Sequence, residues 1–364
     1  MADTKKMCIG VLTGGGDCPG LNAVIRAVTK AALDGGYKVI GIEDGYLGLI
    51  ENRMHPLTER DVSSILTMGG TILGSCNKAD PSAFAVNENG TWVTRDVRDE
   101  IVAHYQEAGL DALVVIGGDG TMTGAAELMK RGLQIVGVPK TIDNDLMGTD
   151  VTFGHDTAVQ TAAEALDKVH TTASSHHRVM VVELMGRYAG WLALHAGVAS
   201  GADVILLPEI PFDLNKIAEH CLSRNTIGKR FTIIAAGEGA KPKGGDQFVE
   251  RIDVSSPDPI RLGGVAKYVA QEVEKRTGIE SRAIVLGHVQ RGGTPTPRDR
   301  LLATEFGFHA FTLLKEGRFG ELVVSRNGQI QSISIHEIAG RVRNVPTDHI
   351  LVRAARAIGT CFGD

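Results

Sequence analysis

Short apolar runs that end in glycine or polar clusters recur along this chain and alternate with longer amphipathic stretches. Runs of this kind lie at 7–13, 112–118, 134–139, 178–185, 231–238 and 282–287, with further apolar runs at 37–42 and 203–209. Amphipathic periodicity predicts helices at about 21–33, 58–68, 97–108 and in a stretch that ends at Met129. Near-continuous Val, Ile and Leu runs are typical of parallel strands covered on both faces. The sequence therefore predicts an α/β fold of two doubly wound domains, with mainly parallel sheets and a cleft between them.

The composition is that of a globular protein rather than a disordered or fibrous one. The 364 residues are 43% hydrophobic and 22% charged, and a chain of this length forms about two compact domains. With 38 Lys and Arg against 43 Asp and Glu, the formal net charge is -5. Duplex nucleic acid and membrane surfaces usually bind a basic patch, so we expect neither partner.

Cysteine usage and hydropathy favour a cytoplasmic location. The five cysteines are odd in number and scattered without a CxxC pair, which indicates reduced thiols rather than disulfides or a zinc site. Residues 1–6 lead into an apolar strand without the apolar core of a signal peptide, and no apolar run has the length of a transmembrane helix. The polar stretch 240–260 is expected to be a surface insertion or loop.

Two glycine-rich segments each join a predicted strand to a predicted helix. Residues 14–20 read GGGDCPG, and residues 117–121 read GGDGT. Glycines there let the backbone approach a phosphate, and the helix amino terminus supplies N–H groups and a positive dipole end. Asp119 can hold Mg²⁺ beside a polyphosphate, or it can serve as a helix N-cap. Residues 14–20 could instead be a tight turn without a phosphate-binding role. Neither segment has the sequence of a Walker A motif.

A predicted loop after the 134–139 run carries two carboxylates close to a lysine. Asp143 and Asp145 stand two residues apart in the sequence TIDND, and Lys140 precedes it. One carboxylate can act as a base on an attacking hydroxyl while the other holds metal or solvent. Asx-rich clusters also occur in ordinary turns, so the pattern alone leaves both interpretations open.

Six motifs occur in a fixed order along most of the chain: GGDxPGxN, GGDGT, PxTIDND, VVExMGRYxG, AxxEG and LGHxQRGG. In this order, over about residues 7–310, the chain resembles the 6-phosphofructokinase family, to which TIDND, MGRYAG and LGHVQRGG are highly specific. The resemblance implies transfer of a phosphoryl group from ATP to the 1-hydroxyl of fructose 6-phosphate, a step of glycolysis, with Mg²⁺ as cofactor.

The resemblance also implies roles for individual residues. Asp143 would be the base for the 1-hydroxyl, and Asp119 would hold Mg²⁺ with Asp145 close by. The donor phosphates would be lined by Gly16, Gly118, Asp119, Gly120 and Thr121. The sugar and the reacting region would be contacted by Thr141, Asp143, Met185, Gly186, Arg187 and Glu238, with Thr141 and Arg187 counted as catalytic. The 6-phosphate would be bound by Arg178, Arg282, His288 and Arg291. In the family, the first two of these arginines come from a neighbouring subunit, which implies a homodimer or homotetramer with shared substrate sites.

The positions of the arginines support an anionic substrate independently of the resemblance. A sugar phosphate calls for arginines, whose planar forks pair bidentately with phosphate oxygens. The arginines concerned stand at strand starts or in strand-end loops: Arg178, Arg187, Arg282 and Arg291. A single arginine is commonly just solvated, whereas four placed in this way favour a phosphate-binding cleft.

Three positions bear on the phosphoryl donor, and they disagree. ATP-using members of the family usually carry an arginine where this chain has Asn77, so that task would fall to Lys78 or Lys140. Lys140 resembles pyrophosphate-using and mixed-lineage members, whereas Gly120 resembles ATP users, because pyrophosphate users tend to carry aspartate at that position. A carboxylate there would repel the α-phosphate of ATP by about 4 kcal/mol, at about 4 Å and an effective dielectric of about 20. We therefore expect ATP as the donor, with the pyrophosphate-linked reaction as the alternative.

The resemblance assigns the two expected domains to the two substrates. Residues 1–154 plus about 290–340 are expected to bind ATP and Mg²⁺, and residues 155–289 plus the C-terminal segment to bind fructose 6-phosphate. An NAD kinase or lipid kinase would share GGDGT, but TIDND followed by MGR and HVQR argues against it. A protein that only binds a sugar phosphate or nucleotide has no need of a base beside the hydroxyl, so the presence of both Asp119 and Asp143 argues against this alternative.

Overall fold

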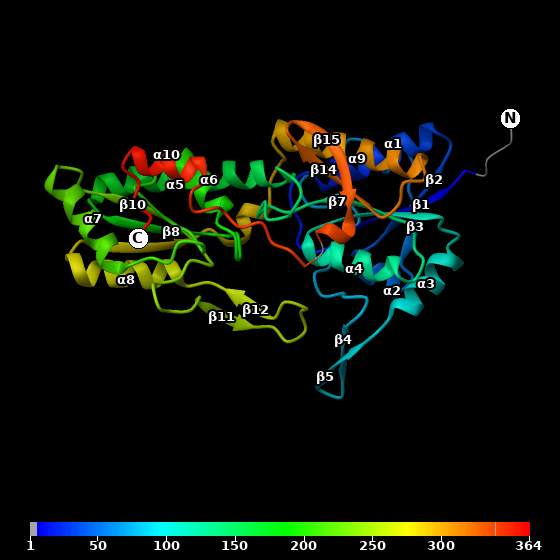
Figure 1. The fold of residues 1–364 in the computed structure, drawn as a ribbon, viewed down its shortest axis with the longest axis horizontal. Helices are drawn as coiled ribbons and strands as arrows, with labels where there is room; N and C mark the ends of the chain where they lie inside the picture. The colour runs from blue at the N-terminus through cyan, green and yellow to red at the C-terminus, as the bar shows by residue number, and fades with distance from the viewer. Residues whose placement is uncertain (1–5, 339) are drawn as a thin grey trace.

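The computed structural model describes residues 6–338 and 340–364, and within them the strands form two main sheets (Figure 1). The seven-stranded sheet has the order β15-β14-β7-β6-β1-β2-β3, and the four-stranded sheet has the order β13-β8-β10-β9. All pairs are parallel except β2 with β3 and β14 with β15, at the two edges of the larger sheet. The predicted α/β class with mainly parallel sheets is confirmed.

The large lobe consists of the seven-stranded sheet and the helices that pack on it. Its strands are β1 (Cys8–Thr13), β2 (Lys38–Ile42), β3 (Met54–Pro56), β6 (Ala112–Gly117), β7 (Ile135–Pro139), β14 (Glu321–Arg326) and β15 (Gln329–Ser334). Its helices are α1 (Leu21–Asp34), α2 (Tyr46–Ile50), α3 (Arg98–Glu107), α4 (Asp119–Met129), α9 (Pro297–Lys315) and the short η2 (Ile335–Glu337). Apolar side chains of α1 and α9 cover one face, and those of α2, α3 and α4 cover the other. A Cβ on Gly307 of α9 would lie 2.8 Å from the carbonyl oxygen of Val24, so this glycine lets α1 and α9 pack closely.

The small lobe consists of the four-stranded sheet and its own helices. Its strands are β8 (Val179–Leu184), β9 (Val204–Leu206), β10 (Thr232–Gly237) and β13 (Ser281–Val285). Its helices are α5 (His155–His176), α6 (Trp191–Ala199), α7 (Leu214–Thr226), α8 (Val265–Thr277), η1 (Gly287–Arg291) and α10 (Ile350–Ala357). Helices α5, α6 and α10 cover one face of the sheet, and α7 and α8 cover the other. The buried Glu183 accepts hydrogen bonds from the N–H groups of Gly264 and Ala266, so it stabilises the start of α8.

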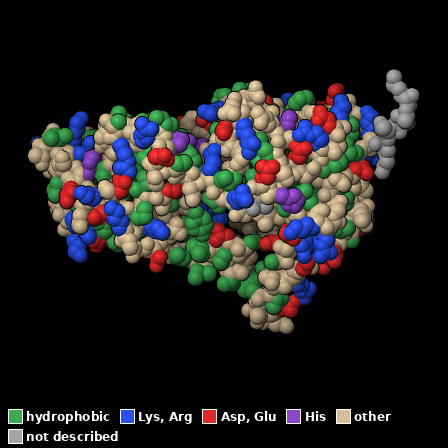
Figure 2. Space-filling view, viewed as in Figure 1, with side chains coloured by type: hydrophobic (Ala, Val, Ile, Leu, Met, Phe, Trp, Pro, Cys, Tyr) green, Lys and Arg blue, Asp and Glu red, His purple; other side chains and the backbone are tan. Residues whose placement is uncertain are grey.

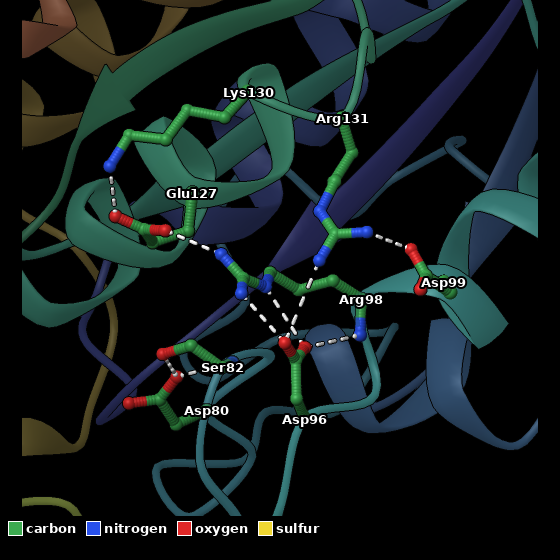
Figure 3. A network of polar contacts seen from close by, with 8 residues as sticks. All are labelled: Asp80, Ser82, Asp96, Arg98, Asp99, Glu127, Lys130 and Arg131. Atoms are coloured by element: carbon green, nitrogen blue, oxygen red, sulfur yellow. Dashed lines mark hydrogen bonds and ion pairs between the residues drawn. The ribbon is translucent and has the colours of Figure 1, made fainter.

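A hairpin projects from each lobe (Figure 1). The large lobe carries β4 (Phe84–Glu88) and β5 (Thr91–Arg95), and the small lobe carries β11 (Val249–Ile252) and β12 (Ile260–Leu262). Figure 3 shows the ion pairs at the base of the first hairpin: Arg98 bonds Glu127 of α4 at 2.7 Å and Asp96, which follows β5, at 2.6 Å. The second hairpin begins within the expected 240–260 insertion and is exposed, as a surface insertion should be.

One predicted helix is wrong. Residues 58–68 form a series of turns, in which the Asp61 carboxylate accepts hydrogen bonds from both the N–H and the hydroxyl of Thr58 at 2.7 Å. Bonds of this kind also occur at the start of a helix, so they do not by themselves prevent one. Ser64 then adopts a left-handed conformation at φ 63°, which a continuing helix does not allow.

Two further stretches differ in extent from the prediction. The apolar run 203–209 contains only the short strand β9, because Pro208 lacks a backbone N–H and cannot extend the ladder. The region after residue 315 carries little sequence signal, yet it supplies β14 and β15 to the large lobe and α10 to the small lobe. In the described part of the chain, no helix is both long and apolar enough to cross a membrane.

Candidate active site

The two glycine-rich segments lie side by side at the centre of the larger sheet. They follow β1 and β6, which are neighbouring parallel strands, at the point where the strand order reverses and ligands of α/β folds usually bind. The Gly14 N–H donates to the carbonyl oxygen of Ile116 at 2.9 Å. A Cβ on Gly14 or Gly117 would lie 2.7 Å or 2.3 Å from the Thr121 side chain. The structure thus joins the segments that the sequence predicts as phosphate loops.

Two cations border the first of these loops. The ammonium of Lys140 donates to the carbonyl oxygen of Gly16, and the guanidinium Nη1 of Arg291 donates to that of Asp17 at 3.0 Å. A Cβ on Gly16 would lie 2.8 Å from Arg291 Nη1, so glycine leaves room for the guanidinium. Lys140 is buried, and burial lowers its pKa. Arg291, expected at the 6-phosphate, therefore lies against the loop expected to bind the donor.

Asp119 is the first residue of α4, and the N-cap is Gly118, so the N-cap alternative for Asp119 is wrong. Its Oδ1 accepts a hydrogen bond from the Gly340 N–H at 2.9 Å. Burial raises the pKa of Asp119, and the bond to Gly340 opposes this effect. The neighbouring Gly120 is exposed, and a Cβ built on it would meet nothing within 4 Å in the described part of the chain.

The candidate Mg²⁺ site has one carboxylate beside a phosphate loop. Within residues 6–338 and 340–364, no group of three or more His, Cys, Asp or Glu side chains could hold a metal by itself. Mg²⁺ is usually bound through one or two carboxylates together with substrate phosphates and waters. Asp119 fits this mode of binding, in which the nucleotide brings the remaining ligands.

Asp143 is buried with an unused carboxylate oxygen. The side chain is 5% exposed, and its Oδ1 has no hydrogen-bond partner among the described residues. The turn is closed instead by the Asp143 N–H, which donates to Oγ1 of Thr141 at 3.0 Å. A buried carboxylate oxygen without a donor is costly, and in a functional site it is typically met by a ligand.

Asp145 shares its environment with Asp143. Burial raises the pKa of Asp145 to about 7, the charge of Asp143 adds to this effect, and a hydrogen bond from Thr141 opposes it. The two carboxylates thus form a pair in which Asp145 favours its protonated form. Such a pair suits transfer of a proton to or from a bound hydroxyl.

The small lobe contributes the loops after β8 and β10. The Arg187 N–H donates to Glu238 Oε1 at 2.9 Å, and Arg187 takes a left-handed conformation at φ 50° just after Gly186 at φ 138°. Burial raises the pKa of Glu238 to about 7, and the charge of Asp143 adds to it. The half-buried Met185 beside this loop packs against the hydrophobic core of the large lobe, so the two lobes meet at this point.

The loop between β11 and β12 contacts predicted phosphate ligands in both lobes. Its Asp253 pairs with Lys78 at 3.2 Å, and its Asp258 pairs with the Arg187 guanidinium at 2.5 Å. Asn77, next to Lys78, is exposed. Any phosphate that these cations bind would therefore have to displace an aspartate.

Two predicted phosphate ligands lie apart from the rest. Arg178 precedes β8 and Arg282 is the second residue of β13, so both lie at the amino end of the small sheet. Strands of five or six residues are about 17–20 Å long, and the loops after them lie at the other end. Arg178 and Arg282 both pair with Glu280, whereas the exposed His288 in η1 lies at the carboxyl end of β13.

A cavity of about 490 Å³ adjoins the TIDND loop and was not foreseen. It is lined by residues of both lobes, including His155, Trp191, His195 and Arg343. His155 Nδ1 lies 2.6 Å from the carbonyl oxygen of Ile142, and its Nε2 lies 2.8 Å from His195 Nδ1. Burial lowers the pKa of His155 to about 3 and that of His195 to about 4, so both rings are neutral at pH 7. These residues form no sequence motif that could have revealed them.

Comparisons with known proteins agree with the geometry. The profile described as phosphofructokinase matches residues 8–314. The "ATP-dependent 6-phosphofructokinase 2" of Clostridium perfringens is 52% identical over 359 residues, with 98% of each chain covered. The "ATP-dependent 6-phosphofructokinase" of Chloroflexus aurantiacus is 48% identical over 362 residues, with 99% of each chain covered.

Solved structures show the same fold. Pichia pastoris phosphofructokinase superposes with a TM-score of 0.78 at 34% identity, covering 92% of this chain and 35% of that one. A pyrophosphate-dependent phosphofructokinase from Nitrosospira multiformis superposes with a TM-score of 0.81 at 21% identity, covering 98% and 93%. At that identity the second likeness shows the fold alone. From the profile match and the full-length relatives, this chain belongs to the phosphofructokinase family.

Proposed function

We propose that this protein is an ATP-dependent 6-phosphofructokinase, which transfers the γ-phosphoryl group of ATP to the 1-hydroxyl of fructose 6-phosphate. The observation that carries the proposal is the unpaired, buried Oδ1 of Asp143, between the glycine loops of the large lobe and the Arg187 loop of the small lobe. The curated relatives at 44–52% identity carry this activity in their names.

The donor would lie in the large lobe. Gly16 and the 118–121 loop would surround its phosphates, with Asn77 and Lys78 at the edge. Mg²⁺, when bound with the nucleotide, would be held by Asp119 and would neutralise phosphate charge. Residues 1–154 plus about 290–340 would thus form the donor-binding domain, which agrees with the packing of α9, β14 and β15 in the large lobe.

The acceptor would lie against the small lobe, residues 155–289 plus the C-terminal segment. Asp143 would take the proton of the 1-hydroxyl as its oxygen attacks the γ-phosphorus, and Thr141 would orient the loop through its bond to the Asp143 N–H. Arg187 would leave Asp258 and balance charge on the transferring group. The sugar would also meet Met185, Gly186 and Glu238, whose loops adjoin Arg187.

The geometry around Gly120 and Lys140 is compatible with ATP as the donor. Packing does not require glycine at 120, since an added Cβ would meet no protein atom within 4 Å in the described residues. The space is therefore available to the donor. Lys140, the marker for pyrophosphate use, is engaged with the Gly16 carbonyl and supports the loop whichever donor binds.

A homo-oligomer would complete the 6-phosphate site. Arg178 and Arg282 at the far end of the small sheet would reach His288 and Arg291 of a neighbouring subunit. The edge strand β13 and η1 expose Val285 by 62% and Val289 by 63%, which suits a subunit contact. Figure 2 shows further hydrophobic side chains gathered below the lobe junction, where the β11–β12 hairpin exposes Ile252. A homodimer or homotetramer is proposed, and a cytoplasmic location follows from the substrates.

An assay of the purified protein tests the proposal. Fructose 6-phosphate is supplied with Mg²⁺ and either ATP or pyrophosphate, and fructose 1,6-bisphosphate is measured. We expect turnover with ATP and little or none with pyrophosphate, and loss of turnover in Asp143→Asn but not in Asp167→Asn, an exposed residue of α5. Turnover with pyrophosphate and none with ATP would contradict the proposed donor.

A further inference from the structure

The chain crosses from the large lobe to the small lobe through residues 340–346, here named the crossing segment. At its start, the Gly340 N–H donates to Asp119 Oδ1 at 2.9 Å. Further along, the Arg343 N–H donates to the carbonyl oxygen of Asp145 at 2.7 Å. The crossing segment therefore contacts both the candidate metal carboxylate and the TIDND loop.

The Arg343 side chain binds the backbone that follows Asp143. Its Nε and Nη2 donate to the carbonyl oxygen of Asn144 at 3.2 and 2.8 Å. Its Nη1 donates to the carbonyl oxygens of Thr149 at 2.7 Å and Asp150 at 2.9 Å. The donors of a guanidinium lie in a rigid planar fork, so these bonds fix the orientation of the peptides that they reach. The Arg343 side chain thus bonds the backbone both within the TIDND sequence and at Thr149 and Asp150 beyond it.

The same guanidinium lies against the small lobe. Its Cζ is 4.7 Å from the ring centroid of Trp191, the first residue of α6, and the indole Nε1 donates to the Arg343 carbonyl oxygen at 2.8 Å. Burial lowers the pKa of Arg343, and the charges of Asp150 and Asp145 oppose this effect. An arginine remains protonated in such a setting. The TIDND loop is therefore connected through Arg343 to the element that follows the Arg187 loop.

The backbone at Asn144 needs such support. Asn144 adopts a left-handed conformation at φ 53°, which is uncommon for a residue other than glycine. Its side chain accepts a hydrogen bond from the Thr152 N–H at 3.1 Å, and its carbonyl is held by Arg343. Because Asn144 separates Asp143 from Asp145, its conformation sets the directions of the two carboxylates relative to one another.

We propose that Arg343 is a positioning residue for phosphoryl transfer. It fixes the peptides after Asp143, keeps the two carboxylates of the TIDND loop in their reactive directions, and makes that geometry depend on the contact between the lobes. Its charge also favours the ionised form of Asp145. This inference rests on the proposed function, in which Asp143 is the base.

The test compares Arg343→Met and Arg343→Lys in the full-length protein, with Arg326→Met as the matched control. Arg326 is also half-buried and donates to a carbonyl of this region, that of Gly148 at 2.7 Å. For each variant, thermal melting, kcat, KM for both substrates and the pH profile of kcat are measured. The unmodified protein, assayed with ATP and fructose 6-phosphate, is the reference.

Arg343→Met should lower kcat by about 10- to 100-fold, because a small misplacement of the base has an effect of this size. KM for both substrates should stay within about threefold of the values for the unmodified protein, since the substitution removes no group that binds either substrate. The acid limb of the kcat profile, which reports protonation of the base and of the neighbouring Asp145, should move to higher pH, because loss of a nearby cation favours protonation of carboxylates. Arg343→Lys should return the acid limb to its position in the unmodified protein but recover only part of kcat. Arg326→Met should change neither the acid limb nor kcat.

Three outcomes would overturn the proposal. The first is a folded Arg343→Met protein with unchanged kcat. The second is an equal loss of kcat in Arg343→Met, Arg343→Lys and Arg326→Met, with no movement of the acid limb of the pH profile. This result would show that Arg343 contributes only to the stability of the fold. If Arg343→Met does not fold, Arg343→Lys becomes the test variant. The third outcome that would overturn the proposal is then a kcat of Arg343→Lys equal to that of the unmodified protein. An inactive unmodified protein would instead refute the proposed function, and with it the basis of this inference.

Discussion

The two ends of the small sheet carry predicted ligands of the same sugar phosphate, but these residues bond different partners. At the carboxyl end, Glu238 is half-buried and bonded to the backbone of Arg187, and its pKa is raised to about 7. At the amino end, Arg178 and Arg282 lie near the surface and pair with Glu280. The carboxyl end thus lies close to Asp143 of the large lobe, whose charge adds to the raised pKa of Glu238. At the amino end, the ion pairs that Arg178 and Arg282 make among the described residues are to glutamates of the same lobe, and in the proposed homo-oligomer these arginines would face a second subunit.

The largest expected effect lies on the large-lobe side of the cleft. Asp143→Asn keeps the shape of the side chain but removes its capacity to accept a proton, so kcat should fall by about 10²- to 10⁴-fold. KM for fructose 6-phosphate should change little, because the phosphate is bound elsewhere. Steady-state kinetics check this, with Asp167→Asn on the exposed face of α5 as the control. Near-normal kcat in Asp143→Asn would refute the assignment of the base.

The next largest effect concerns the donor. Gly120→Asp should fold, because an added side chain has open space, but it should weaken ATP binding nearly a thousandfold if repulsion costs about 4 kcal/mol. Thermal melting with and without ATP and the KM for ATP measure this. Gln106→Asp, which also adds a carboxylate to an exposed position of the large lobe, on α3, is the control. An unchanged KM for ATP in Gly120→Asp would show that the donor phosphates lie elsewhere.

An intermediate effect is expected at the amino end of the small sheet. Arg282→Ala should raise KM for fructose 6-phosphate by about 10- to 100-fold, since a charged hydrogen bond contributes about 1.5–3 kcal/mol. The KM for ATP should not change. Arg276→Ala, another exposed arginine of the same lobe, is the control. If the KM for fructose 6-phosphate rose equally in both variants, the two ends of the sheet would not differ in function.

The smallest expected effect is on stability. The pKa of Asp145 is raised to about 7 in the folded protein, so the folded state loses stability as the pH rises from about 4 to 7. Asp145→Asn removes this loss and should raise Tm at pH 8 by about 2–4 °C for each kcal/mol regained. At pH 4 the gain should vanish. Calorimetry at the two pH values checks the sign, and a lower Tm at pH 8 would contradict the raised pKa.

The sequence predicted those features that depend on local pattern. Strands such as β6 and β10 follow from Val- and Ile-rich runs, and the loops at Gly16 and Asp119 follow from glycines at strand ends. The helix expected at 58–68 is absent, and Ser64 within it adopts a left-handed backbone conformation at φ 63°. Periodicity cannot detect such a local backbone conformation.

The role of Arg343 could not be predicted, for a different reason. Its partners are backbone carbonyls about 200 residues earlier in the chain, beginning with that of Asn144, 199 positions away. Backbone carbonyls have no residue identity, so no motif marks the contact. The cavity beside His155 was hidden in the same way, because its lining comes from both lobes.

Complementation between subunits tests the shared site most directly. Asp143→Asn and Arg282→Ala proteins are mixed, unfolded and refolded together, and formation of hybrids is verified by mass. In a dimer, half of the molecules are hybrids and one of their two sites carries both intact residues, so activity should recover to about a quarter of the unmodified level. Recovery to that level would confirm that Arg282 acts in the site of its neighbour. Verified hybrids with no more activity than the separate variants would show that each subunit builds its site alone.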